Sequence, residues 1–79
     1  MARRNDELVM GFAKVIRQRR EKIGVSQEAL AFDAELHRTY VSQLERGLKS
    51  PSLSAIAGLA DALGVRPYQL VKAAEDQSK

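Results

Sequence analysis

The chain has 79 residues, which is room for one domain. Its formal net charge is +3 and its sequence pI is near 9.6, and this mild basic excess suits a polyanionic partner. Hydrophobic residues make up 44% and charged residues 29%, as in globular rather than disordered chains, and the lack of cysteine excludes disulfides and thiolate metal sites. No apolar run approaches the ~18 residues of a membrane span and no signal-peptide pattern is present, so we expect a cytoplasmic protein without a membrane partner.

The first predicted helix covers residues 7–23. Its apolar residues recur at helical spacing, at Leu8, Phe12, Val15, Ile16 and Ile23. Asp6 suits the N-cap of this helix, and Gly24 suits its C-terminal stop. Residues 1–6 are expected to form a flexible N-terminal arm.

Two short helices are predicted in the middle of the chain. Ser26 caps the first of them, which runs through Ala34. The second covers residues 38–46 and ends at Gly47. Only a tight turn separates the two.

Two more helices follow. The first is capped by Ser52, or by Ser50 if Pro51 is its first residue, and it ends at Gly64. Its apolar stripe consists of Leu53, Ile56, Leu59, Ala60 and Leu63. Pro67 begins the last helix, in which Leu70 and Val71 face the core or a partner. No long stretch alternates with period two, as a strand would. We therefore predict a compact all-α domain of five helices over residues 7–74 and a disordered tail over residues 75–79.

The stretch "LHRTYVSQLERG" at residues 36–47 concentrates polar side chains that could suggest an active site. However, His37 is the only histidine, Ser42 lacks a GxSxG context, and there is no Gly-rich phosphate loop. We therefore expect no enzyme activity, no metal site and no cofactor. A helix that is merely solvated would favour Lys and Glu at i,i+4 spacing over the Arg, Thr, Tyr, Ser and Gln found in this stretch.

These residue types are instead the ones that read base edges and bind phosphates in DNA. A major groove accepts one helix that a preceding helix supports, and the two short helices supply such a pair. The whole basic excess lies in residues 1–49, with ten Lys and Arg against seven Asp and Glu. The sequence therefore favours a helix-turn-helix, formed by the second and third predicted helices.

Four segments resemble the Cro/repressor-type helix-turn-helix regulators, the xenobiotic-response-element family. They are "IRQRREKIGVSQEALA", "RTYVSQLERG", "PSLSAIAGLADALGV" and "PYQL", and together they cover about residues 12–70. The stretch "LAFDAELHRTYVSQLERG" is most similar to the controller proteins of restriction–modification systems. The resemblance implies a lambda-repressor-like DNA-binding domain.

The resemblance also implies DNA contacts residue by residue. Base reading falls to Arg38, Thr39 and Gln43. Contacts with the DNA backbone or flanking groups fall to Gln27, Tyr40, Ser42, Arg46, Lys49 and Ser52. His37 is either a further phosphate contact or a solvated residue at the start of its helix. Arg20 and Glu45 are expected to form an internal ion pair, and Tyr68 and Val71 belong either to a dimer interface or to the core.

Two positions depart from the family's pattern. Glu35 stands where the family usually has a glycine at positive φ, so we predict a left-handed Glu35 at a cost of ~1 kcal/mol. Arg66 stands where Ser or Asp commonly caps the last helix, so we expect a weaker cap there.

The function that the resemblance implies is sequence-specific transcriptional regulation in a bacterium or phage, by repression or activation. A homodimer, formed through the fifth predicted helix and the end of the fourth, would bind a palindromic operator in double-stranded DNA. Its third helix would lie in the major groove, and the protein would regulate its own promoter. RNA polymerase is a further expected partner, and no small-molecule ligand is expected. The same fold also occurs in antitoxins and in adaptor-type protein-interaction modules, and the sequence leaves this alternative open.

Overall fold

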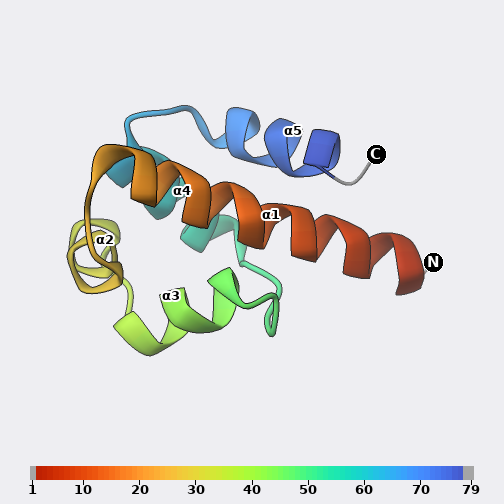
Figure 1. Cartoon of the computed structure of the whole chain (residues 1–79), viewed down its shortest axis with the longest axis horizontal. Coiled ribbons are helices and arrows are strands. Elements are labelled where there is room, and N and C mark those ends of the chain that lie inside the picture. Colours follow the sequence, from red (N-terminus) through yellow and green to blue (C-terminus); the bar gives the residue numbers. More distant parts are fainter. Residues whose placement is uncertain (1, 78–79) are drawn as a thin grey trace.

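The computed structural model describes the backbone of residues 2–77 and the side chains of residues 5–77. Over this range the chain forms five α-helices and no strand: α1 (Ala2–Ile23), α2 (Gln27–Ala34), α3 (Arg38–Glu45), α4 (Leu53–Leu63) and α5 (Pro67–Gln77). The long α1 has α5 along one side and α3 on the other (Figure 1). None of the five is long and apolar enough to cross a membrane. The prediction of an all-α fold with five helices is confirmed.

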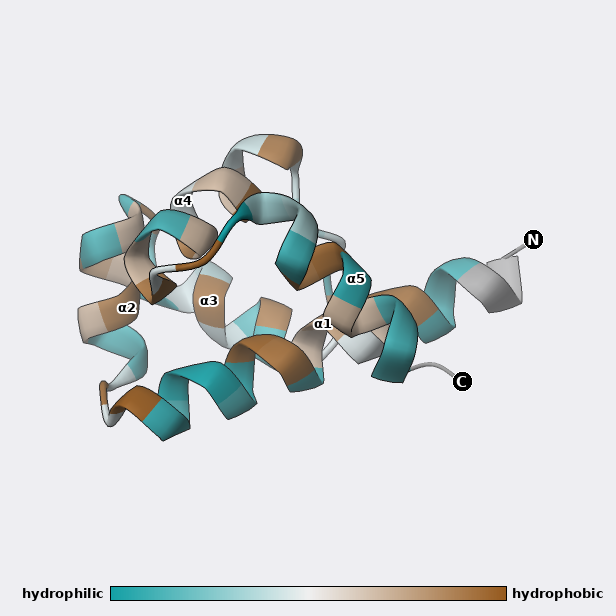
Figure 2. Cartoon of the chain, turned by 90° about the horizontal axis from the view of Figure 1, so that it is seen from above, coloured by the Kyte–Doolittle hydropathy of each residue, from teal (hydrophilic) through white to brown (hydrophobic). Residues whose placement is uncertain are grey.

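The core receives at least one fully buried aliphatic side chain from each helix. These side chains are at most 1% exposed and belong to Ile16, Leu30, Leu44, Leu59 and Leu70. Burial of a side chain of this size contributes about 1.5–3 kcal/mol to the free energy of unfolding. Hydrophobic and hydrophilic residues alternate along α1 and α5 in Figure 2, as expected of helices that bury one face.

The starts of α2, α4 and α5 lie where they were predicted. The Oγ atom of Ser26 accepts a hydrogen bond from the backbone N–H of Ala29 at 3.0 Å. The Oγ atom of Ser52 likewise accepts one from Ala55 at 3.0 Å, and Pro67 is the first residue of α5. Each cap satisfies a backbone N–H that the start of a helix leaves without an intrahelical partner.

The weak cap expected at Arg66 is compensated from inside α5. The backbone N–H of Arg66 donates to the side-chain Oε1 of Gln69 at 2.7 Å. This bond is the half of a capping box in which the third helical residue reaches back to the cap position. The start of α5 therefore has a side-chain partner without a Ser or Asp.

Glu35 adopts the predicted left-handed conformation at the end of α2, with φ 59° and ψ 43°. Among the described residues it is the one non-glycine residue with positive φ. Its backbone N–H donates to the carbonyl of Phe32 at 3.2 Å, and the N–H of Leu36 donates to the carbonyl of Ala31 at 2.8 Å. These bonds satisfy the last carbonyls of α2 as a terminal glycine usually would. The turn that aims α3 is therefore retained.

The outer ends of α1 and α5 differ from the prediction. α1 begins at Ala2, so Asp6 lies inside the helix and its assignment as N-cap is wrong. The segment before residue 7 contains no Gly or Pro, and its Ala and Arg residues favour a helix, which explains the earlier start. α5 continues to Gln77, so residues 75–77 of the expected tail are helical. Residues 1, 78 and 79 lie outside the range that the structure describes.

Three apolar residues that were assigned to buried stripes are exposed. Leu53 is 84% exposed, Ile23 is 51% exposed and Leu8 is 37% exposed. Ile23 and Leu53 are terminal residues of their helices, and Leu8 lies in the N-terminal part of α1. Helical spacing identified the correct face of each helix, but it did not indicate how far along the helix the neighbouring helices extend.

Gly58 allows α4 to lie directly against the end of α2. A Cβ atom at this position would lie 2.6 Å from the backbone carbonyl oxygen of Ala34. Ala55 and Leu59 on the same helix are at most 1% exposed. α4 therefore supports the helix that precedes the turn to α3.

Candidate nucleic-acid interface

α2 and α3 are two eight-residue helices joined by the turn at residues 35–37. Ala31 of α2 and Val41 of α3 are buried in the same core cluster. The small side chain of Ala31 lets the two helices approach closely. One face of α3 is thereby buried, and the opposite face is free to contact a partner.

The side chains of α3 and of its flanking residues divide by face. The buried ones are Val41, Leu44 and Glu45. The exposed ones are His37, Arg38, Thr39 and Arg46. The half-buried ones are Tyr40, Ser42 and Gln43. The three predicted base-reading residues are therefore at least partly accessible.

Four of the predicted DNA-contacting residues meet in one hollow of about 220 Å³. It is lined by Gln27 at the start of α2 and by Arg38, Thr39 and Ser42 on α3. All four side chains can donate hydrogen bonds. The start of α2 also presents backbone N–H groups and the positive end of the helix dipole, which favour an anion. Gln43 does not line this hollow.

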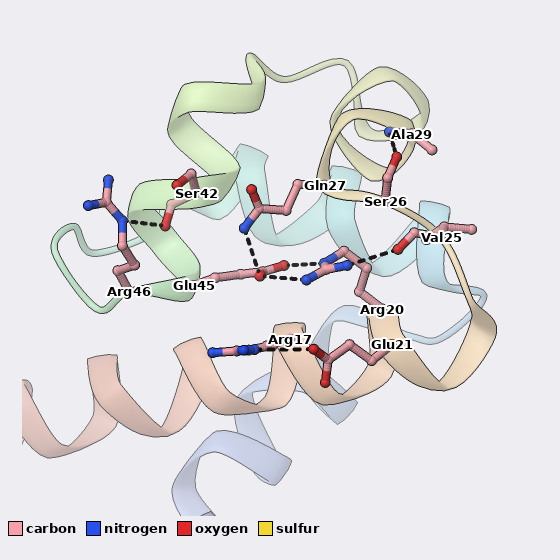
Figure 3. A network of polar contacts seen from close by, with 10 residues as sticks. All are labelled: Arg17, Arg20, Glu21, Val25, Ser26, Gln27, Ala29, Ser42, Glu45 and Arg46. Atoms are coloured by element: carbon pink, nitrogen blue, oxygen red, sulfur yellow. Dashed lines mark hydrogen bonds and ion pairs between the residues drawn. The ribbon is translucent and has the colours of Figure 1, made fainter.

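The expected ion pair between Arg20 and Glu45 is present beneath this surface (Figure 3). Nε of Arg20 donates to Oε2 of Glu45 at 2.6 Å, and Nη2 donates to Oε1 at 3.0 Å. Nη1 of Arg20 also donates to the carbonyl of Val25, at 2.9 Å, in the loop between α1 and α2. The Glu45 side chain is only 3% exposed. The pair therefore joins α1, the following loop and the end of α3.

The pKa of Arg20 is raised above its usual value, first by the hydrogen bond with Glu45 and then by the negative charges of Glu45 and Glu21, against the opposing effect of burial. The guanidinium is therefore charged at any pH the protein meets. Because it holds both carboxylate oxygens, the buried charge of Glu45 is compensated.

Gln27 has a contact that the sequence did not reveal. Its Nε2 donates to Oε1 of Glu45 at 3.0 Å, so the residue expected at a phosphate also belongs to the Arg20–Glu45 network (Figure 3). The two residues are 18 positions apart in the sequence. No local pattern predicts a bond between them, because it depends on how α2 and α3 pack.

Tyr40 and Ser52 also contact one another inside the domain. The Tyr40 ring packs against the core, and its hydroxyl oxygen accepts a hydrogen bond from the backbone N–H of Ser52 at 3.3 Å. The Ser52 hydroxyl oxygen accepts the cap bond of α4, and its hydrogen is still available to donate. Both residues therefore have a structural contact beside any contact with DNA.

Arg46, Lys49 and His37 are exposed at the two ends of α3 and in the following loop. Nε of Arg46 donates to the carbonyl of Ser42 at 3.4 Å, which directs the side chain along α3 and leaves its terminal N–H groups free for a phosphate. His37 occupies the N-cap position of α3, and its side chain makes no cap hydrogen bond.

An apolar groove lies apart from the hollow at Gln27. It has a volume of about 560 Å³, and its exposed apolar residues are Leu8, Leu48, Leu53 and Val71. Tyr68, the other predicted dimer residue, is 66% exposed on the same helix as Val71. Leu70, between them in sequence, is fully buried. Of the predicted residues of α5, Leu70 thus belongs to the core, whereas Tyr68 and Val71 are accessible.

Comparison with known proteins identifies the family. Residues 16–70 match the family model described as Helix-turn-helix. The chain belongs to the helix-turn-helix family. This family model covers α2, its turn, α3 and α4, together with the C-terminal part of α1 and the start of α5. The resemblance noted in the sequence is confirmed.

Several relatives within the helix-turn-helix family are controller proteins. The chain is 48% identical over 61 residues to the control protein C.BamHI of Bacillus amyloliquefaciens, which covers 76% of this chain and 75% of that protein. The restriction-modification controller protein C.AhdI from Aeromonas hydrophila superposes with a TM-score of 0.76 at 42% identity, over 78% of this chain and 94% of that one.

A second structural relative has been solved with DNA. The restriction-modification controller protein C.Esp1396I, as a tetramer in complex with its natural 35 base-pair operator, superposes with a TM-score of 0.79 at 25% identity. The match covers 90% of this chain and 93% of that one. The two solved structures therefore share the fold of this chain over most of their length.

Proposed function

We propose that this protein is a sequence-specific transcriptional controller that binds a palindromic DNA operator as a homodimer, with α3 in the major groove. The observation that carries the proposal is the hollow at the start of α2. There the start of α2, whose backbone N–H groups favour an anion, meets the outward face of α3, and every lining side chain can donate a hydrogen bond. The controller relatives favour this function over an antitoxin or adaptor role.

Arg38, Thr39 and Gln43 are the residues we assign to base reading. Arg can donate to O6 and N7 of guanine, Gln can pair with adenine, and Thr combines a hydroxyl with a methyl that packs on thymine. Arg38 and Thr39 lie in the exposed first turn of α3, and N-terminal residues of a recognition helix reach the base edges.

The DNA backbone would be held from both ends of α3. Gln27 and Ser42 face the hollow, and His37 lies at the start of the helix. Arg46, Lys49 and Ser52 lie at the end of α3, in the next loop and at the cap of α4. Tyr40 lies beside the base-reading residues. Contacts of this kind fix the position of α3 in the groove but do not select a sequence.

A homodimer would supply the second recognition helix that a palindromic operator requires. We place its interface at α5, through Tyr68 and Val71, and at the start of α4, through Leu53. The sequence had suggested the end of α4, but Leu63 there is half-buried, whereas Leu53 is 84% exposed and lines the same groove as Val71. An exposed apolar groove of this kind favours a protein contact.

Regulation would follow from operator occupancy in the cytoplasm. A dimer on the promoter of its own gene would block RNA polymerase or, placed just upstream, assist it. A gel shift with the DNA upstream of the gene, in the presence of random-sequence competitor, tests the proposal. We expect a retained complex at a competitor excess that removes non-specific binding, and equal competition by random DNA would contradict sequence-specific binding.

A further inference from the structure

Gln27 lies where the two parts of the proposed interface meet. It is the first residue of α2 and lines the hollow with Arg38 and Thr39 of α3. Its side chain also donates to Glu45, the last residue of α3, at 3.0 Å. Glu45 is too deeply buried for direct contact with DNA, because its side chain is only 3% exposed. An influence of Glu45 on DNA binding would therefore have to pass through another residue.

Hydrogen-bonding chemistry fixes the orientation of the Gln27 amide. A carboxylate only accepts hydrogen bonds, so Nε2 rather than Oε1 faces Glu45, as Figure 3 shows. Nε2 carries two hydrogens, and the bond to Glu45 uses one of them. A DNA phosphate also only accepts, so the second hydrogen is the side-chain donor that Gln27 retains for the backbone. A rotated amide would turn Oε1 toward the carboxylate of Glu45, which has no hydrogen to donate.

Arg20 allows Glu45 to hold this amide without repelling the DNA. Oε1 of Glu45 accepts from both Nη2 of Arg20 and Nε2 of Gln27, each at 3.0 Å. Oε2 accepts from Nε of Arg20 at 2.6 Å. The guanidinium therefore compensates the carboxylate charge and holds it in place. Among the described residues, no side-chain N or O atom that is buried lacks a hydrogen-bond partner.

We propose that Glu45 is a positioning residue for the DNA-backbone contact, because its carboxylate fixes the Gln27 amide so that the free Nε2 hydrogen meets a phosphate in the hollow. The inference rests on the proposed DNA-binding function. It adds that one buried carboxylate, which ends the base-reading helix, also aims a phosphate contact on the preceding helix. The two kinds of DNA contact are thereby held at a fixed spacing.

A double-mutant cycle of Gln27→Ala and Glu45→Gln tests this coupling. Affinity for the operator is measured by fluorescence anisotropy at a temperature where circular dichroism shows each variant folded. We expect Gln27→Ala to weaken operator binding about tenfold in the otherwise wild-type protein. In the Glu45→Gln background the same substitution should cost less than about twofold. An unchanged affinity of Gln27→Ala, or an equal loss in both backgrounds, would overturn the inference.

Gln27→Asn provides an independent test that leaves the Arg20–Glu45 pair intact and does not depend on the folding of Glu45→Gln. Its amide is one methylene shorter and cannot reach from Glu45 to the phosphate, so we expect a loss like that of Gln27→Ala. Wild-type affinity of this variant would count against the inference. Gln77→Ala is the matched control, because it removes an amide that donates to Gln18 at 3.2 Å between α5 and α1, and it should leave operator affinity unchanged.

Operator duplexes with single methylphosphonate substitutions separate this role from a purely structural one. At one phosphate of each half-site, the methylphosphonate should weaken binding by the wild-type protein. The same substitution should leave the affinity of Gln27→Ala unchanged. If Gln27 only stabilised the fold, the substitution would lower the melting temperature and leave the pattern of sensitive phosphates unchanged. A wild-type protein that does not prefer the operator to random DNA would instead reject the proposed function, so the two failures are distinguishable.

Discussion

The hydroxyl oxygen of Tyr40 accepts a hydrogen bond from the backbone N–H of Ser52, 3.3 Å away, and this bond joins α3 to the start of α4. The two residues are 12 positions apart, and the loop between them contains Arg46 and Lys49. A residue of α3 therefore also fixes the loop that follows this helix.

Removal of this hydroxyl should lower stability without disturbing the ring. We expect Tyr40→Phe to lower the free energy of unfolding by about 0.5–1.5 kcal/mol, because the ring still packs on the core and only the hydrogen bond is lost. Urea unfolding measures the change. Tyr68→Phe is the control, since the Tyr68 hydroxyl has no hydrogen bond within the described part of the chain, and it should leave stability unchanged. Equal stability of Tyr40→Phe and wild type would show that the bond contributes nothing.

Replacement of Arg38 should affect specificity more than general DNA affinity. We expect Arg38→Ala to cost about 1–3 kcal/mol of operator binding and to relax the preference at one base position. Anisotropy titrations against duplexes varied one base pair at a time would measure both effects.

Arg46→Ala is the comparison for Arg38→Ala. Because Arg46 is assigned to a phosphate, its loss should weaken specific and random DNA alike and lower the slope of log affinity against log salt by about one. If both variants lost operator and random DNA to the same extent, the division between base and backbone contacts would be wrong.

Glu35→Gly should stabilise the protein. Glu35 has φ 59°, a conformation that costs a side chain ~1 kcal/mol and costs glycine little, so we expect a gain of about 0.5–1 kcal/mol. Glu35→Ala removes the same carboxylate but keeps the strained Cβ, and it should show no such gain. Thermal or urea unfolding of the three proteins distinguishes relief of strain from loss of charge.

Leu53→Asp should weaken the proposed dimer and leave the fold intact. The side chain is 84% exposed at the first position of α4, where a carboxylate also suits the helix dipole. Phe32→Asp is a matched control, because Phe32 is 83% exposed on α2 and does not line the apolar groove. Analytical ultracentrifugation of wild type should show a dimer that Leu53→Asp dissociates and Phe32→Asp does not. A wild type that remains monomeric at high micromolar concentration, free and on DNA, would exclude the dimer.

Features set by neighbouring residues in the chain could be predicted from the sequence. Ser26 and Ser52 cap their helices because each needs only the N–H three residues later, and Pro67 starts α5 because its fixed φ suits a first turn. The exposure of Leu53 and the bond between Gln27 and Glu45 could not be predicted from the sequence, because both depend on how separate helices pack. The resemblance named the residues of the candidate site one by one, but only the structure shows that four of them line one hollow.

The core also determines how the protein can lose activity. Every helix supplies at least one fully buried side chain, so no subset of helices encloses the core, and we expect the domain to unfold in a single cooperative transition. The outward face of α3 would then exist only while α5, the last described helix, is in place. A proteolytic cut or truncation that removes α5 should therefore leave no partly active regulator. The amount of folded protein would be the quantity that sets how much promoter DNA is occupied.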